Sequence, residues 1–274
     1  MTTLVPLLSD IPLDVLTIRI LTTAFVVMTI SWAVGIFGPI IGGALAGLPI
    51  ILGPGFYFLA KQAPAAFVAQ AASYALLSLC ATQFFLLAYI TTAGTLRPWI
   101  ALACAIGTWM FVALLLQLLP AWPIVGAVGF IVATSICLRL GQRFVMDGSP
   151  TKGRAGFGLL AVRGSLAGAL VAAVTTASHW LGSTGAGLLL AFPIGYTVVA
   201  VTIHHTFGSA SVVATLYSAL LGTASLAGFC IALTIAIPHW TPSIALGIAL
   251  ATSVIITLAL ILRRRLLAIS LDRK

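Results

Sequence analysis

The residues that could carry function in this sequence are basic residues and helix-interrupting prolines and glycines rather than acids. The four acids Asp10, Asp14, Asp147 and Asp272 all lie in terminal or loop segments, and the chain has no Glu. An acid inside a membrane span is the usual relay for protons or sodium in a pump, so we do not expect that chemistry. The fixed charges are positive, which favours a neutral or anionic solute over a cationic one.

Two arginines occupy matching places near the start of two apolar stretches. Arg19 and Arg163 are separated by 163 − 19 = 144 residues. Their guanidinium groups could draw an anion toward a site from the two sides of a membrane. The alternative is that each is an interfacial arginine whose long stem lets the charge reach lipid headgroups.

Two prolines interrupt apolar stretches at the same separation. Pro49 follows Gly43 and Gly47, Pro193 follows Gly187, and 193 − 49 = 144. Proline removes a backbone donor and frees carbonyl groups, which at membrane depth must be satisfied by neighbours or line a water-filled cavity. Paired interruptions of this kind indicate a transporter binding site. Two kinked helices that pack closely through glycine are the alternative.

Polar residues follow each interrupted stretch: Lys61 and Gln62 after the first, His204 and His205 after the second. They could line a vestibule, where a histidine could shuttle protons, or they could simply end a span at the membrane surface. No metal-ligand spacing, phosphate-binding motif or nucleophile–base set is present. We therefore expect no enzyme activity, metal or cofactor. The predicted substrate site consists of Gly47, Pro49, Pro193, Gly195, Arg19, Arg163, Lys61, Gln62, His204 and His205.

The elements that must position these residues are membrane-spanning helices. The chain is 61% hydrophobic and 6% charged, whereas soluble domains carry about 25% charged residues. Runs of roughly 20 apolar residues, the length of a spanning helix, recur along the chain and leave no room for a soluble domain. Cys80, Cys104, Cys137 and Cys230 lie in these runs without paired spacing, so we expect buried, unreactive thiols.

The apolar pattern predicts an all-α polytopic membrane protein with nine helices. Glutamines within or at the ends of these spans, Gln70, Gln83 and Gln117, are expected to form interhelical hydrogen bonds. The predicted helices are 16–37, 39–60, 65–92, 99–118, 122–140, 158–180, 185–203, 208–237 and 243–262.

The separation of 144 residues extends beyond the arginines and prolines of the predicted site. It also pairs Gly38 with Gly182 and Pro98 with Pro242. We interpret it as duplication of a four-helix unit. Equivalent helices are then five apart, an odd number, so the two units have opposite orientations and form a 4+1+4 inverted repeat. The predicted units are 14–118 and 158–262, with a connector at 119–157 and a basic tail at 263–274.

Basic residues set the predicted orientation of the helices. With the N-terminus outside, only Arg19 and Lys61 fall on the outer side, and the remaining Lys and Arg residues fall inside. This bias follows the positive-inside rule and predicts an N-out, C-in protein of a bacterial inner (plasma) membrane. The net charge of +9 is then explained by contact with anionic lipid at the cytoplasmic loops, and no nucleic acid partner is expected.

One stretch is similar to a known family. Ala46-Gly47-Leu48-Pro49, followed by Pro54, Phe56 and an apolar helix after Lys61-Gln62, resembles the small four-helix bacterial membrane proteins of the GlpM type. Those proteins are single units of about the size of one repeat here, and the second half of this chain keeps Ala191-Phe192-Pro193. The resemblance implies architecture but no defined activity. The 4+1+4 layout is also that of double-domain fluoride channels, which use Asn and Phe-rich motifs, whereas this chain has no Asn.

These observations predict a secondary transporter or permease for a small neutral or anionic solute. The solute would bind near the membrane midplane between the interrupted second and seventh helices. Two alternatives remain open: a lipid flippase or scramblase with a polar groove facing lipid, and a non-catalytic subunit of an envelope complex. The expected partners are the lipid bilayer and the solute, and assembly as a homodimer is left open.

Overall fold

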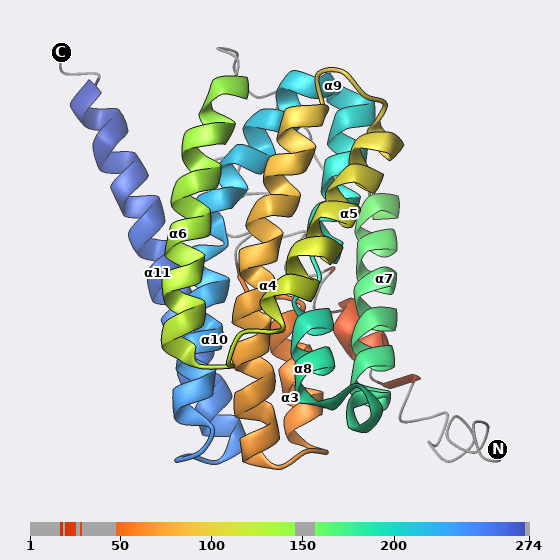
Figure 1. The fold of residues 1–274 in the computed structure, drawn as a ribbon, viewed down its shortest axis with the longest axis vertical. Helices are drawn as coiled ribbons and strands as arrows, with labels where there is room; N and C mark the ends of the chain where they lie inside the picture. The colour runs from red at the N-terminus through yellow and green to blue at the C-terminus, as the bar shows by residue number, and fades with distance from the viewer. Residues whose placement is uncertain (1–16, 19, 26–27, 29–47, 146–156, 272–274) are drawn as a thin grey trace.

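The computed structural model describes residues 17–18, 20–25, 28, 48–145 and 157–271. All regular elements in these ranges are helices (Figure 1). Arg19, Gly47, most of the predicted first helix and residues 39–47 of the predicted second helix lie outside the described residues.

Proline and glycine set many of the helix ends. α5, α6 and α11 begin at Pro98, Pro123 and Pro242, and the fixed φ of proline suits the first helical position. The helices are α3 (Leu52–Ala60), α4 (Ala65–Thr92), α5 (Pro98–Leu116), α6 (Pro123–Gly141), η1 (Gln142–Phe144), α7 (Phe157–Thr176), α8 (Ser178–Leu190), α9 (Ile194–Gly222), α10 (Ala224–Ala236) and α11 (Pro242–Leu271).

Several helical segments are long and apolar enough to cross a membrane, as predicted. Among the described residues, five segments meet this standard by length and composition: Ala65–Thr92, Pro98–Leu116, Pro123–Phe144, Trp180–Ala236 and Pro242–Arg263. The Trp180–Ala236 segment has 57 residues, whereas one crossing needs about 20. It is also interrupted between Leu190 and Ile194 and again at Gly208.

The predicted seventh and eighth helices differ from the observed ones in where they break. The range 185–203 is divided between α8 and α9. Within α9, Gly208 has φ 82° and ψ 178°, a conformation that favours glycine, so α9 consists of helical pieces on either side of it. His204 and His205 therefore lie within the first piece and not after it. A further break at Thr223 separates α9 from α10, so the predicted 208–237 helix is also divided.

α4 is the central helix of the bundle (Figure 1). Over an apolar stretch of 18 residues in α4, 72% of the residues are buried, against 22% for the corresponding stretch of α5. α5, α6, α8, α9 and α10 all pack against it. Its lower half lies beside α8 and α10, and its upper half lies beside the first piece of α9 (Figure 1).

Polar side chains of α4, the buried Gln83 and the exposed Gln70, hydrogen-bond to neighbouring helices. Gln83 Nε2 donates to Thr223 Oγ1 at 2.6 Å, and Gln70 Oε1 accepts from the Ser183 hydroxyl at 2.7 Å. The predicted interhelical role is therefore confirmed for these two glutamines. Gln117 instead forms the C-terminal cap position of α5.

The outer helices present large apolar side chains to their surroundings. Phe111 on α5, Ile131 on α6 and Ile255 on α11 are each about two-thirds exposed, as expected for surfaces that face lipid. Cys104 of α5 is also exposed, so the prediction that all four cysteines are buried was wrong for this residue. The reason is physical: lipid and protein core are both apolar, so an apolar sequence does not reveal which one a side chain faces.

Candidate functional site

The two proline-containing segments form the same backbone turn. At the first, the Ile50 N–H donates to the Leu48 carbonyl at 2.7 Å, and at the second the Ile194 N–H donates to the Phe192 carbonyl at 2.7 Å. The prolines themselves accept the next bonds, Pro49 from residue 53 at 2.7 Å and Pro193 from residue 197 at 3.0 Å. Each turn is thus followed directly by a helix, α3 or α9.

At the second turn the helix is interrupted and not merely kinked. In a continuous helix the Leu188 carbonyl would accept from the Phe192 N–H, but that N–H donates to Leu189 at 3.1 Å. The hydroxyl of Ser78, which is fully buried on α4, donates to the Leu188 carbonyl at 2.9 Å instead. α4 therefore satisfies a backbone group that the break releases, as an apolar environment requires.

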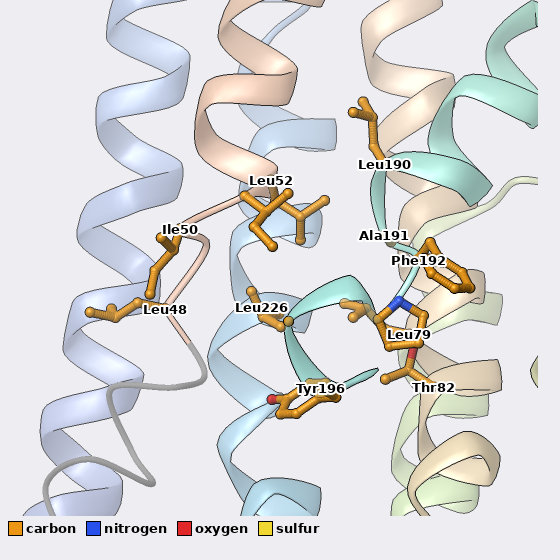
Figure 2. Close-up of a pocket in the computed structure, with 13 residues that line it drawn as sticks. Leu48, Ile50, Leu52, Leu79, Thr82, Leu190, Ala191, Phe192, Tyr196 and Leu226 are labelled. Carbon is orange, nitrogen blue, oxygen red and sulfur yellow. The ribbon is translucent and has the colours of Figure 1, made fainter. Parts of the chain in front are cut away.

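A cavity lies between the two turns (Figure 2). About 60 Å³ of it is open to the centres of water molecules. Since one water needs about 10–15 Å³ by this measure, the cavity has room for roughly four to six groups of that size. Its walls come from both turns, α4 and α10: Leu48, Ile50, Ile51, Leu52, Leu79, Thr82, Leu190, Ala191, Phe192, Pro193, Gly195, Tyr196 and Leu226.

The polar groups of this cavity are few. The Thr82 hydroxyl, in the cavity wall, donates to the Ser78 carbonyl at 3.0 Å, which leaves its oxygen lone pairs as acceptors. Tyr196 contributes a phenol to the wall (Figure 2). The described residues contain no Asp or Glu, so no described carboxylate opposes a negative charge in the cavity.

Both new helices present their N-terminal ends to the cavity. The cap residues, Ile51 for α3 and Pro193 for α9, make no side-chain capping hydrogen bond, and helix N-termini carry partial positive charge. α3 runs toward the lower end of the molecule, where Phe56 packs on Phe229 of α10 with ring centres 6.1 Å apart. The first piece of α9 runs toward the upper end (Figure 1). Two positive helix ends thus meet at one cavity from opposite directions.

The structure brings part of the predicted site together. Pro193 and Gly195 line the cavity. Pro49 contributes through its turn, since the flanking Leu48 and Ile50 line it. Gly47 and Arg19 lie outside the described residues, and so does the side chain of Arg163 within α7.

Lys61 and Gln62 lie away from the cavity walls, in the exposed turn after α3. The Lys61 Nζ lies 5.6 Å from the centre of the Tyr57 ring, and Gln62 Nε2 donates to the Phe58 carbonyl at 2.9 Å. This turn immediately precedes α4 and is at the lower end of the molecule (Figure 1).

The two histidines are near the other end of α4. His204 Nδ1 is 3.2 Å from the Tyr89 hydroxyl, and the two rings meet edge to face with centres 5.8 Å apart. His205 is exposed. Neither histidine lines the cavity, and the described residues contain no cluster of three or more His, Cys, Asp or Glu side chains that could hold a metal.

Sequence reasoning missed the walls that α4 and α10 contribute. Leu79, Thr82 and Leu226 are ordinary residues of apolar helices, and only their contacts in the fold mark them. Ser78 was also missed, although a serine in the middle of an apolar helix is a weak signal for a carbonyl partner.

No protein-family model matches this chain, and no curated protein or solved structure is significantly similar to it. The resemblance to GlpM-type proteins therefore stays a prediction.

Proposed function

We propose that this chain is a permease of the inner membrane that carries a small neutral or anionic solute. The solute would bind in the cavity between the Pro49 and Pro193 turns. The observation that carries the proposal is that two proline-containing turns, far apart in the sequence, form the walls of one cavity. The N-terminal ends of α3 and α9 there offer N–H donors to an anion or a hydroxyl oxygen.

The size of the cavity restricts the solute. Room for roughly four to six water-sized groups suits inorganic phosphate, lactate or glycerol, and excludes a disaccharide unless the cavity opens. The apolar walls disfavour a highly charged solute, because the two helix ends supply only partial charge.

Helix positions support the proposed inverted repeat. α4 begins at Ala65 and α5 at Pro98. Adding 144 to 65 gives 209, the residue directly after the break at Gly208 in α9. Adding 144 to 98 gives 242, the first residue of α11. Contacts follow the same relation, since α5 packs on α9 and α11 packs on α3.

A close contact of α7 supports a two-fold relation between the units. A Cβ added at Gly168 would lie 2.7 Å from the Ile20 carbonyl oxygen, and one added at Gly164 would lie 3.0 Å from the Ala24 carbonyl oxygen. In the proposed repeat, Ile20 is equivalent to Gly164 (20 + 144 = 164) and Ala24 is equivalent to Gly168 (24 + 144 = 168). Exchanging the two units therefore turns the Ile20–Gly168 contact into the Gly164–Ala24 contact. Self-complementary contacts of this type arise at a two-fold axis.

Nine spans with an N-out, C-in orientation complete the proposal. Arg97 in the α4–α5 turn and Arg139 near the end of α6 lie at the upper end of the molecule, whereas Lys61 lies at the lower end (Figure 1). The positive-inside rule then makes the upper end cytoplasmic. Rocking of 14–118 against 158–262 would open the cavity to each side in turn.

A binding experiment tests the site. Thermal unfolding of the purified protein is measured against phosphate, lactate and glycerol, because a ligand of the folded state raises the melting temperature with its concentration. Ala191→Leu fills the cavity, and Ala103→Leu on the exposed face of α5 is the matched control. A saturable shift that persists in the control and is lost in Ala191→Leu supports the proposal, and so does uptake of the same solute into proteoliposomes.

Other results would favour the alternatives. A solute shift unchanged in Ala191→Leu would place the site elsewhere. Shifts from added phospholipid alone would favour a flippase or scramblase. Stoichiometric co-purification of another protein, without any solute response, would favour a subunit of an envelope complex.

A further inference from the structure

A second, larger pocket opens between α5 and α8. About 230 Å³ of it is open to the centres of water-sized groups, compared with about 60 Å³ in the central cavity. Apart from the indole nitrogen of Trp109, every side-chain atom in its wall is apolar. The walls are Trp109, Met110, Ala113 and Leu114 of α5 and Gly185, Leu188 and Leu189 of α8.

The pocket opens on the outer surface of the bundle at the depth of the hydrocarbon. Met110 and Leu114 on its rim are 52% and 56% exposed. Trp109 lies within α5, 11 residues after Pro98 and 7 before Leu116, which is about 16 Å and about 10 Å along the axis. On the other wall, the Leu188 carbonyl accepts a hydrogen bond from the Ser78 hydroxyl, in the middle of α4. At this depth the surrounding medium is lipid chain and not water.

The inner wall of the pocket is shared with the central cavity. The Trp109 and Phe192 rings meet edge to face, with centres 4.9 Å apart and an interplanar angle of 88°. Phe192 belongs to the turn before α9 and lines the central cavity. This aromatic pair therefore links the walls of the two spaces, and a ligand against Trp109 would support the turn that forms the solute site.

We propose that this pocket binds one alkyl chain of a bilayer lipid, with the Trp109–Phe192 pair as the end wall that the chain contacts. Three observations select this occupant: the apolar lining, the opening at hydrocarbon depth and the continuity with the exposed apolar face of α5. The volume accommodates roughly 15 to 23 water-sized groups, comparable with a lipid chain. Filling it recovers dispersion contacts that the wall would otherwise lack. The proposal does not depend on which solute the central cavity takes.

Fluorescence quenching by brominated lipid tests the proposal directly. The chain has 6 tryptophans, and a variant retaining only Trp109, with the others replaced by phenylalanine, is placed in phosphatidylcholine vesicles brominated near the middle of the acyl chain. Trp109 is 5% exposed, so bulk lipid reaches it poorly unless a chain enters the pocket. The reference is a variant with Trp109→Phe and Phe111→Trp. Its indole lies at similar depth but faces outward, because Phe111 is 65% exposed.

We expect Trp109 to be quenched at least half as strongly as the reference, at every protein-to-lipid ratio. Gly185→Leu in the single-tryptophan background places a side chain in the pocket and should reduce the quenching at least twofold. Gly107→Leu is the matched control, because Gly107 is exposed on α5 with nothing within 4 Å of an added Cβ.

Three results would overturn the proposal. Quenching of Trp109 below one-fifth of that of the reference would show that no chain enters. This comparison does not require Gly185→Leu to fold. Strong quenching by acrylamide would show a water-filled pocket. Quenching that appears only on dilution of the protein in the bilayer would show that a second copy of this chain covers the site.

Discussion

The contact between α8 and α4 makes a quantitative prediction at Gly187. A Cβ built at this position would overlap the carbonyl oxygen of Ala71 and would lie 2.9 Å from both the Ala71 carbonyl carbon and the Tyr74 Cβ. Ordinary carbon contacts are about 3.5–4.0 Å. Two of these three atoms are backbone, which cannot rotate away, so Gly187→Ala forces α8 to move from α4 or to strain.

The size of the effect follows from a matched substitution. Gly107→Ala adds the same methyl group within α5, where nothing lies within 4 Å. Both substitutions gain about 0.8–1.0 kcal/mol of helix propensity, and this gain cancels in the difference between them. The difference is the cost of overpacking, about 1–3 kcal/mol. At about 2–4 °C per kcal/mol for a chain of roughly this size, Gly187→Ala should melt about 2–12 °C below Gly107→Ala.

Thermal unfolding of both variants in the same detergent, followed by circular dichroism, measures this difference. Equal melting temperatures, or a higher one for Gly187→Ala, would refute the close approach of α8 to α4. The position of the Pro193 turn, which α8 carries at its end, would then be refuted with it.

Three further predictions concern the polar groups and the orientation. Ser78→Ala removes the donor to the carbonyl released at the break and should lower the free energy of unfolding by about 1 kcal/mol, measured by denaturant titration. A double-mutant cycle of Gln83→Leu and Thr223→Val should give a coupling of about 0.6 kcal/mol, and at most about 1.7; zero coupling would contradict the 2.6 Å bond between them. In a cysteine-free background, an impermeant thiol reagent should label Lys61→Cys in intact cells and Arg97→Cys only after permeabilisation, and the reverse pattern would invert the proposed orientation.

Much of the helical pattern was predictable from the sequence. The 65–92 helix was predicted at its observed bounds, and α5 and α6 differ from prediction by at most two residues at each end. Prolines at helix starts and polar turns carry this information locally, because their conformational effects do not depend on distant contacts. The turn at Pro193 was found for the same reason.

The assignment of faces and partners was less predictable. Cys104 was predicted to be buried and is exposed, and the pocket beside Trp109 was not predicted at all. In a soluble protein a polar face would separate inside from outside, but here lipid replaces water and both faces are apolar. Lys61 and His204 were predicted to belong to the site and instead lie near opposite ends of α4. Their equivalent spacing in the sequence did not predict this, because contacts between helices decide where the end of each segment lies.

The hydrogen bonds of α4 also have a consequence for assembly during synthesis. Its buried Ser73, Ser78 and Gln83 find partners that are 161, 110 and 140 residues later in the chain. At about 5–20 residues per second, the 140 residues between Gln83 and its partner take roughly 7–28 s to translate. During that time these three side chains have no native partner in another helix. The newly inserted first half must therefore wait beside lipid or insertion machinery that tolerates those groups, and the second half completes the fold of the first as it enters.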